Sequence, residues 1–366
     1  MCRRFDLSLI PVLRSGFTHR FRSADGRYHV SRTAPWDALR DCLSPLLRRY
    51  KAARGKVSSE TVRELATISL GESLRQSDAS PDLQAMANAL RAFFLADPDD
   101  ISVLPVIEQI AKGGSPAQAE FFRIEEGNDR LIVALQRAID GRVLLGHSIR
   151  SVANALDRIV LTMTDPAGLT QQIEADYVVM TLPASTLRQV DVQPALPDDQ
   201  RHAIERLAYG CATKVLVQRS GSLFGKRRAR AFATDGAVGA FWDASEGEGE
   251  HASIVAFLAG GSTSASLRDK AVGDGSALLS ELCWLGAATA PITAVHIADW
   301  TSDPWAGGGY AFLDPGFDPA WRPLLARRAG RMVFAGEHTS ERWQGYMNGA
   351  VESGQRAARE LIEMIR

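Results

Sequence analysis

Residues 333–354 read VFAGEHTSERWQGYMNGAVESG and carry the clearest structural signal of the chain. The apolar run 332–335 predicts a strand, and apolar residues at helical spacing predict a helix with one apolar face over 345–366. A polar loop and a glycine-rich start would leave backbone amides free at the positive end of this helix. Such an end suits a phosphate or an electron-rich ligand edge, and glycine lets a flat ligand approach. An ordinary turn between a strand and a helix shows the same pattern, so both interpretations stay open.

Length and composition indicate a soluble protein of about two domains. The chain has 366 residues, 45% of them hydrophobic, and a net charge of -1. Because no strong overall charge is present, neither nucleic acid nor a membrane is an expected partner. The longest uncharged run, 282–298, contains Pro291 and is shorter than the roughly 20 apolar residues of a membrane helix. The four cysteines lie far apart without a CxxC pair, so we expect a cytoplasmic protein with neither a disulfide framework nor a metal site.

Local patterns predict helices mixed with strands. Two segments alternate around turn residues and predict hairpins, at 17–30 and at 158–175. The run 143–145 predicts a short strand, and the apolar run 177–181 predicts a strand buried on both faces. Apolar residues at helical spacing predict helices in the first third, over 36–50, 59–73 and 82–94. These elements indicate the α/β (α+β) class, with a layered domain of parallel strands and a second domain of mixed sheet and helices.

The segment 333–354 closely resembles the C-terminal FAD motif of the flavin-containing amine oxidase family, which includes monoamine, polyamine and L-amino acid oxidases. The resemblance implies that Gly336 and Glu337 lie along the ribityl-pyrophosphate part of FAD. It also implies that the Met347 amide faces the pyrimidine end of the isoalloxazine, where a helix N-terminus stabilises the negative charge of the reduced ring. The other cofactor-binding residues implied at this helix start are Gly345, Tyr346 and Ala350.

Four further segments resemble motifs of that family, in the family's order. Residues 122–131, FRIEEGNDRL, are similar to a Gly-Gly turn and its helix, with Glu126 in place of the first glycine. Residues 148–152 resemble a strand whose last residue, Val152, receives the adenine. The other implied cofactor contacts are Thr181 and Pro183 in the strand end TLP, and Trp305, Gly308 and Gly309 in the loop WTSDPWAGGGY at 300–310. Together with residues 333–354, these segments cover roughly residues 60–366.

The resemblance implies three catalytic residues. Lys214 matches a lysine that holds a water against flavin N5 and assists reoxidation by dioxygen, although a strand lysine is more often an exposed edge residue. Tyr310 and Tyr346 match two aromatic residues that flank the substrate amine, although simple core packing is the alternative. Trp343 would support this wall. Gly309 stands where some members carry a flavin-linking cysteine, so the implied FAD is non-covalent.

The implied reaction is the oxidation of an amine or amino acid to an imine, with dioxygen reduced to hydrogen peroxide. The cofactor performs the difficult step, and the protein supplies alignment, a dry cavity and a positioned water. A substrate carboxylate would need an arginine, for which Arg123 and Arg342 are candidates. The implied domains are 1–121 and 194–299 for the substrate, and 122–193 and 300–366 for a truncated Rossmann-like FAD-binding layer.

The sequence departs from the family pattern in one respect. It contains no GxGxxG turn after a strand, the motif whose amides cradle a dinucleotide pyrophosphate. Three explanations stay open: a second polypeptide supplies this unit, the sequence is a fragment, or the chain is a degenerate relative. The alternatives to an oxidase are therefore a non-catalytic or partner-dependent subunit of a flavoprotein, or another FAD oxidoreductase of the same superfold.

Overall fold

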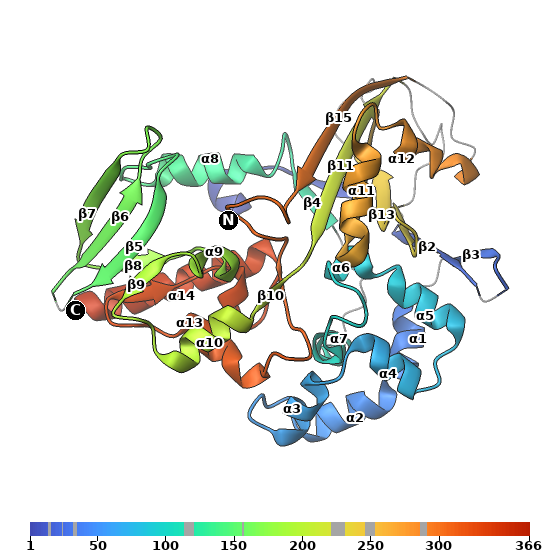
Figure 1. Cartoon of the computed structure of the whole chain (residues 1–366), viewed down its shortest axis with the longest axis horizontal. Helices are drawn as coiled ribbons and strands as arrows, with labels where there is room; N and C mark the ends of the chain where they lie inside the picture. The colour runs from blue at the N-terminus through green and yellow to red at the C-terminus, as the bar shows by residue number, and fades with distance from the viewer. Residues whose placement is uncertain are drawn as a thin grey trace.

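The computed structural model describes residues 1–13, 16–23, 25–31, 35–112, 121–155, 157–220, 231–245, 253–285 and 291–366. Within these residues, a seven-stranded sheet forms one half of the molecule (Figure 1), in the order β15–β11–β14–β13–β12–β2–β3. All its neighbouring strands are antiparallel except β2 and β12. Its strands are β2 (Phe17–Arg22), β3 (Tyr28–Ser31), β11 (Ala212–Arg219), β12 (Ala231–Thr234), β13 (Ala240–Asp243), β14 (Ser253–Gly260) and β15 (Ile292–Asp299).

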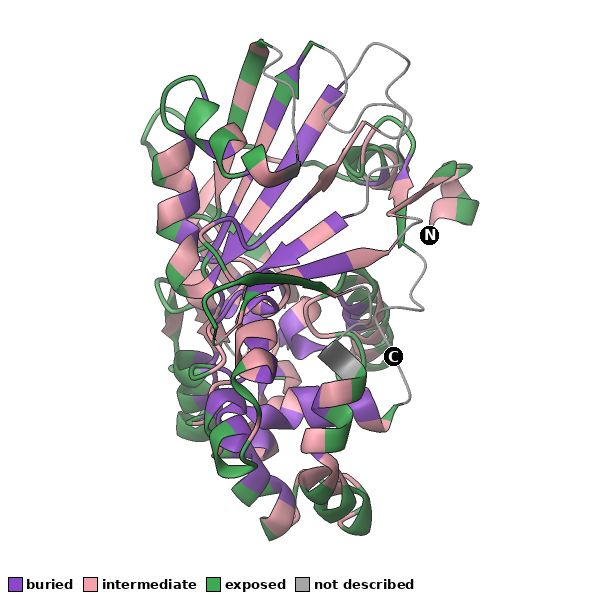
Figure 2. Ribbon diagram, turned by 90° about the vertical axis from the view of Figure 1, so that its right-hand side faces the viewer, coloured by how far each residue is buried: buried purple, intermediate pink, exposed green. Residues whose placement is uncertain are grey.

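Helices cover one face of this sheet. Val215 and Val217 of β11 are fully buried in a core that α11 and α12 complete. Because side chains alternate along a strand, Lys214 and Leu216 point to the opposite face, where both are partly buried. Figure 2 shows buried residues along most of these strands. The helical segments on this side are η3 (Gly261–Thr263), α11 (Ser264–Ala271), α12 (Ser276–Ser280) and η4 (Cys283–Leu285).

A helical region follows the first hairpin and has its own core of leucine, isoleucine and valine side chains. The predicted helices exist, but each is broken in two. Pro45 lies at the start of the second helix, where proline is favoured, and Ser69 caps the fourth by accepting the amide of Glu72. The helices are α1 (Pro35–Cys42), α2 (Ser44–Ala52), α3 (Glu60–Ala66), α4 (Leu70–Gln76), α5 (Pro81–Asn88), α6 (Arg91–Phe94) and α7 (Val103–Ala111).

The other half of the molecule combines a four-stranded sheet, β7–β6–β5–β9, with a parallel pair, β8 and β17. The predicted hairpins 158–175 and 17–30 are both confirmed, as β6–β7 and β2–β3. The elements of this half are α8 (Asp129–Ala138), β5 (Ser148–Asn154), β6 (Ile159–Thr164), β7 (Thr170–Ala175), β8 (Val178–Met180), α9 (Ala184–Leu187), β9 (Asp191–Gln193), α10 (Asp198–Arg206), η5 (Pro319–Trp321), α13 (Arg322–Ala326), β17 (Met332–Phe334), η6 (Glu337–Thr339) and α14 (Met347–Ile365).

Two small sheets connect the halves. One pairs β1 (Leu9–Val12) with β4 (Phe121–Ile124), and the other pairs β10 (Ala208–Tyr209) with β16 (Ala311–Phe312). A short helix, η1 (Cys2–Phe5), precedes β1. In the described part of the chain, no helix is both long and apolar enough to cross a membrane.

Three local predictions were wrong. Residues 143–145 form no strand, because they lie unpaired at the surface with Leu145 76% exposed. The strand predicted at 177–181 is shorter, and Val178 and Val179 are only partly buried. The C-terminal helix begins at Met347 rather than residue 345, because Gly345 has a φ of 83° that a right-handed helix does not allow.

The apolar face predicted for α14 is only partly covered. Ala357 is buried beside Val333 of β17, whereas a row at intervals of four is exposed. This exposed row consists of Ala350, Gly354, Ala358 and Ile362.

The domain boundaries stay predictions. Leu196 and Ile204, assigned above to the substrate part, pack in the same core as Val152 and Phe334.

Candidate active site

Several of the positions implied as cofactor contacts lie together at the carboxyl ends of β8 and β17. These strands are parallel, with Met180 opposite Phe334, so Thr181 and Gly336 leave the sheet at the same edge. Ligands of parallel sheets bind at such an edge. Pro183 follows at the start of α9, and Glu337 begins η6. Tertiary structure thus brings together two segments more than 150 residues apart in the sequence.

The carboxylate of Glu337 connects two further segments to this edge. Oε1 accepts the backbone amide of Ala311 at 3.2 Å, and Oε2 accepts the amide of Gly345. Burial raises the pKa of Glu337, and the two amides oppose this shift. The side chain therefore points into the protein and joins β16 to the start of α14.

Tyr310 and Tyr346 lie close together at this junction. A Cβ on Gly345 would be 3.4 Å from Cδ2 of Tyr310, so the backbone before Tyr346 covers the Tyr310 ring. The Tyr310 hydroxyl donates to the carbonyl of Phe93, and burial raises its pKa. Tyr346 is 58% exposed and meets Trp343 edge to face at a centroid distance of 6.1 Å. One tyrosine is therefore fixed in the protein, and the other lines its surface.

The N-terminus of α14 is uncapped. Tyr346 occupies the N-cap position without a side-chain hydrogen bond, and the amides of Met347 and Asn348 follow in the first turn, where helices provide no backbone acceptor. The sharp approach to the helix needs glycine, since a Cβ on Gly349 would lie 2.2 Å from the carbonyl oxygen of Trp343. Tyr346, Met347 and Ala350 are exposed here, so the positive end of a long helix is open to a ligand.

The loop 300–310 is anchored beside this helix end. The amide of Gly309 donates to the Gly210 carbonyl at 2.8 Å, and the amide of Gly308 donates to the Trp300 carbonyl at 2.8 Å. Its middle rests on α9, because the Ser185 hydroxyl donates to the carbonyl of Ala306. The loop is held by backbone contacts and leaves Trp305 68% exposed.

Lys214 lies on the open face of β11, opposite Leu258 and Ala298. Its ammonium is 5.3 Å from the ring centroid of Trp242. Burial, and then the charge of Arg123, lower its pKa. Gly210, four residues earlier, donates its amide to the Tyr310 carbonyl at 3.1 Å, so Tyr310 lies beside the segment that leads into β11. The described contact of the Lys214 ammonium is thus with the Trp242 ring, and Arg123 acts on it through its charge.

The other positions singled out from the sequence are Val152, Glu126 and Arg342. Val152 is fully buried in β5, between β6 and β9, and its contact with adenine stays a prediction. Glu126, in the place of a family glycine, has a φ of 65°, which is uncommon for any residue but glycine or asparagine. Arg342, a candidate for carboxylate recognition, is largely exposed and lies 3.9 Å from Glu352. Among the described residues, no cluster of side chains suited to a metal is present.

Sequence reasoning missed Tyr209 and Phe93. The hydroxyl of Tyr209 accepts the amide of Ala184 at 2.9 Å, and its strand pairs with β16. Burial raises the pKa of Tyr209, as it does for Tyr310. Neither residue lies in a recognisable motif, and their partners are distant in the sequence, so no local signal pointed to them.

Comparison with known proteins identifies the family. The model of the flavin containing amine oxidoreductases matches residues 7–362. This chain belongs to that family. Flavin-containing amine oxidase A of Equus caballus is 25% identical over 252 residues, 65% of this chain and 46% of the relative. L-amino acid dehydrogenase of Synechocystis is 22% identical over 279 residues, 74% of this chain and 57% of the relative.

Solved structures confirm the fold. Cyclohexylamine oxidase from Brevibacterium oxydans IH-35A aligns with a TM-score of 0.79 at 20% identity, over 99% of this chain and 84% of its own. Putrescine oxidase aligns with a TM-score of 0.79 at 18% identity, with the same shares covered. The α/β fold with mixed sheets is therefore that of the family. The chain spans about half the length of the curated relatives it matches.

Proposed function

We propose that this chain takes part in the FAD-dependent oxidation of an amine or amino acid to an imine, with dioxygen reduced to hydrogen peroxide. The observation that carries the proposal is the uncapped start of α14, which lies beside Tyr310 and the carboxyl ends of β8 and β17. Membership of the amine oxidoreductase family supports a flavin as the ligand of this site.

The residues at this junction fit the flavin end of FAD. An open helix start with exposed aromatic neighbours suits a flat ring that gains negative charge, and the amide of Met347 would stabilise that charge. When bound, FAD supplies the acceptor for the hydrogen and electrons that leave the carbon next to nitrogen. Gly309 provides no thiol for a covalent link, which supports non-covalent binding.

The side chains of the chain itself would align the substrate. The faces of Tyr310 and Tyr346 attract an amine nitrogen and would orient it before the ring. Burial and the charge of Arg123 lower the pKa of Lys214, and its side chain would hold a water or transfer a proton beside the ring. Its role in reoxidation stays a proposal.

The test is a flavin titration followed by an activity assay. The purified chain is mixed with FAD, and bound flavin is measured from its visible spectrum after gel filtration. Peroxide is then measured with a panel of primary amines and L-amino acids. Bound flavin with peroxide supports the proposal. Bound flavin without peroxide from any amine would favour another oxidoreductase of the same superfold, and failure to bind flavin would count against an autonomous enzyme.

A second proposal concerns that partner: a separate polypeptide supplies the strand and helix with the GxGxxG turn. The edge of β17 away from β8 favours it. Of the described strands, only β8 pairs with β17. On the other side Ala329, which lies outside any named strand, exchanges two backbone hydrogen bonds with Met332, and the guanidinium of Arg356 donates to the carbonyl of Phe334 at 2.7 Å. An additional parallel strand would replace the side-chain contact at Phe334 with backbone bonds.

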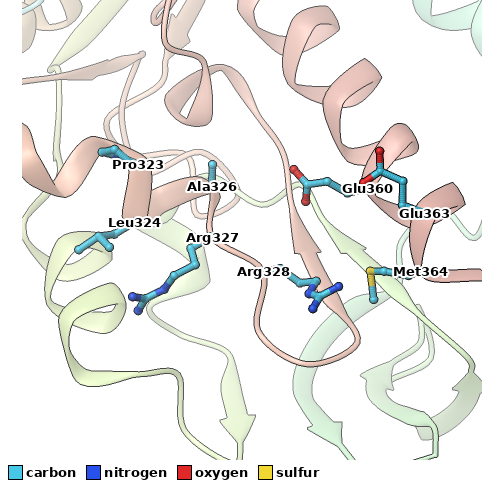
Figure 3. A pocket seen from close by; sticks show the side chains of 8 residues that line it. All are labelled: Pro323, Leu324, Ala326, Arg327, Arg328, Glu360, Glu363 and Met364. Carbon is cyan, nitrogen blue, oxygen red and sulfur yellow. The ribbon is translucent and has the colours of Figure 1, made fainter.

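The surroundings of this edge favour a strand followed by a helix. A hollow of about 530 Å³ opens between α13 and α14, and Figure 3 shows Leu324 and Arg327 on one side with Glu363 and Met364 on the other. The exposed row of α14, at intervals of four from Ala350 to Ile362, is made of small and apolar residues that permit a close helix contact. Cyclohexylamine oxidase also contains a portion that this chain does not match, since the chain covers 84% of that protein.

The partner proposal is tested by co-expression with a polypeptide that carries a strand, a GxGxxG turn and a helix. A yellow complex that elutes together supports it. Ala358→Glu should prevent the complex, whereas Arg359→Glu, one position along the same helix, should not. If neither variant changes the complex, or if the wild-type chain binds FAD alone with full activity, the proposal is wrong.

A further inference from the structure

We propose that Glu337 is a positioning residue whose carboxylate fixes the relative placement of Tyr310 and Tyr346. Its consequence for catalysis rests on the oxidase function proposed above, but its structural effect can be measured without activity. The contact of Glu337 with the cofactor, implied by the family resemblance, stays a prediction. In the structure its two oxygens accept backbone amides of the protein.

Glu337 holds two residues, each next to one of the tyrosines. Ala311 directly follows Tyr310, and Gly345 directly precedes Tyr346. One carboxylate therefore binds the peptide unit that follows Tyr310 and the one that precedes Gly345, one residue before Tyr346. Because the two segments lie more than 30 residues apart, no local turn sets the distance between them. Glu337, the first residue of η6 after β17, provides a fixed point between both.

The chemistry of this contact requires a carboxylate. Each amide donates one hydrogen, and an ionised carboxylate can accept at both oxygens. A glutamine has only one acceptor oxygen. Its NH₂ group would face the second backbone amide, and two hydrogen-bond donors cannot pair with each other. In the described part of the chain Glu337 forms no salt bridge. The backbone amides of Ala311 and Gly345 therefore compensate the negative charge of its buried carboxylate.

The two tyrosines depend on this contact to different degrees. Tyr310 has a second anchor, because its hydroxyl donates to the carbonyl of Phe93. Tyr346 is 58% exposed, and its described side-chain contact is the ring of Trp343. Loss of the Glu337 contact should therefore displace the segment of Tyr346 more than that of Tyr310.

The experiment compares amide hydrogen exchange in the wild type, in Glu337→Gln and in Glu174→Gln, an exposed glutamate of β7 that serves as control. We expect Glu337→Gln to accelerate exchange at Gly345 by about tenfold, with a smaller effect at Ala311 and little elsewhere. Glu174→Gln should change neither amide. Uniform acceleration over the whole protein, or unchanged exchange at Gly345, would overturn the proposal.

A kinetic measurement separates this role from direct cofactor binding. In an active preparation, Glu337→Gln should raise KM for the amine while the affinity for FAD stays near that of the wild type. Weakened FAD binding with unchanged exchange at Gly345 would instead assign Glu337 to the cofactor. If the wild type forms no peroxide, the oxidase proposal fails, and the exchange data still decide whether Glu337 positions the two segments.

Discussion

Arg356 of α14 donates from Nη2 to the carbonyl of Phe334, 2.7 Å away, at the edge of β17 that no described strand covers. The same nitrogen donates to the hydroxyl of Thr339, and Nη1 donates to Glu360. A single side chain thus connects the last parallel strand, the loop after it and the C-terminal helix.

Arg356→Met should lower the free energy of unfolding by about 1–3 kcal/mol, because it removes charge-assisted hydrogen bonds and leaves a partly buried carbonyl without its donor. Urea denaturation measures the loss. The matched variant Arg359→Met, on an exposed turn of the same helix, should change stability by less than about 0.5 kcal/mol. Equal effects of both variants would show that the edge contact contributes nothing specific.

Two glycines should respond in opposite directions to alanine. Gly345 has a φ of 83°, and a Cβ there would contact the Tyr310 ring, so Gly345→Ala should destabilise the protein by about 1–2 kcal/mol. Gly354 lies inside α14 with nothing within 4 Å of an added Cβ, so Gly354→Ala should stabilise it by about 0.5–1 kcal/mol. Thermal unfolding of both variants measures these changes in stability. A higher melting temperature for Gly345→Ala would contradict the positive φ assigned to Gly345.

His19 should make the protein sensitive to acid. Burial lowers its pKa to about 4, and Nδ1 has no hydrogen-bond partner among the described residues. The folded protein therefore keeps this ring neutral, and its contribution to stability is present above pH 6.5 and lost as the pH falls toward 4. The loss is roughly 3 kcal/mol in this window. His338, whose pKa is also about 4, adds a similar loss.

Replacement of His19 tests this dependence. His19→Leu should lose less stability than the wild type between pH 6.5 and pH 4, because only one of the two buried histidines then remains. His29→Leu, at a half-exposed position in the neighbouring strand, should follow the wild-type curve. Denaturant curves at several pH values provide the measurement, and identical slopes for His19→Leu and wild type would refute the assignment.

Lys214→Met should separate function from stability. The pKa of Lys214 is lowered, so its ammonium opposes folding at neutral pH, and wild-type stability rises as the pH approaches the ordinary lysine pKa of 10.5. The apolar variant removes this cost and should melt at the same or a higher temperature. In an active preparation it should form peroxide about a hundredfold more slowly.

The control for this variant is Lys56→Met, at an exposed loop position. It should change neither melting nor peroxide formation. A Lys214→Met protein that is less stable, yet still reacts with dioxygen at the wild-type rate, would make Lys214 a purely structural residue.

Where prediction succeeded, the signal was local. The hairpin at 158–175 follows from alternation around Asp165 and Gly168, and the described turn uses the Asp165 carboxylate to accept nearby amides. Pro45 and Ser69 are also local signals, because each marks the start of a helix. The predictions missed both helix starts, because apolar residues continue at helical spacing across them. The strand predicted at 143–145 failed because a run of apolar residues becomes a strand only when a partner is available.

The sequence by itself determined the elements whose residues carry their own conformational preference, together with the resemblance of residues 333–354 that pointed to a flavin. Tertiary structure alone decided that Glu337 turns toward Ala311 and Gly345, that Tyr310 reaches Phe93, and that Lys214 faces Trp242. These contacts join residues far apart in the chain, and their free energy exists only after strands and helices have packed, so no local pattern encodes them.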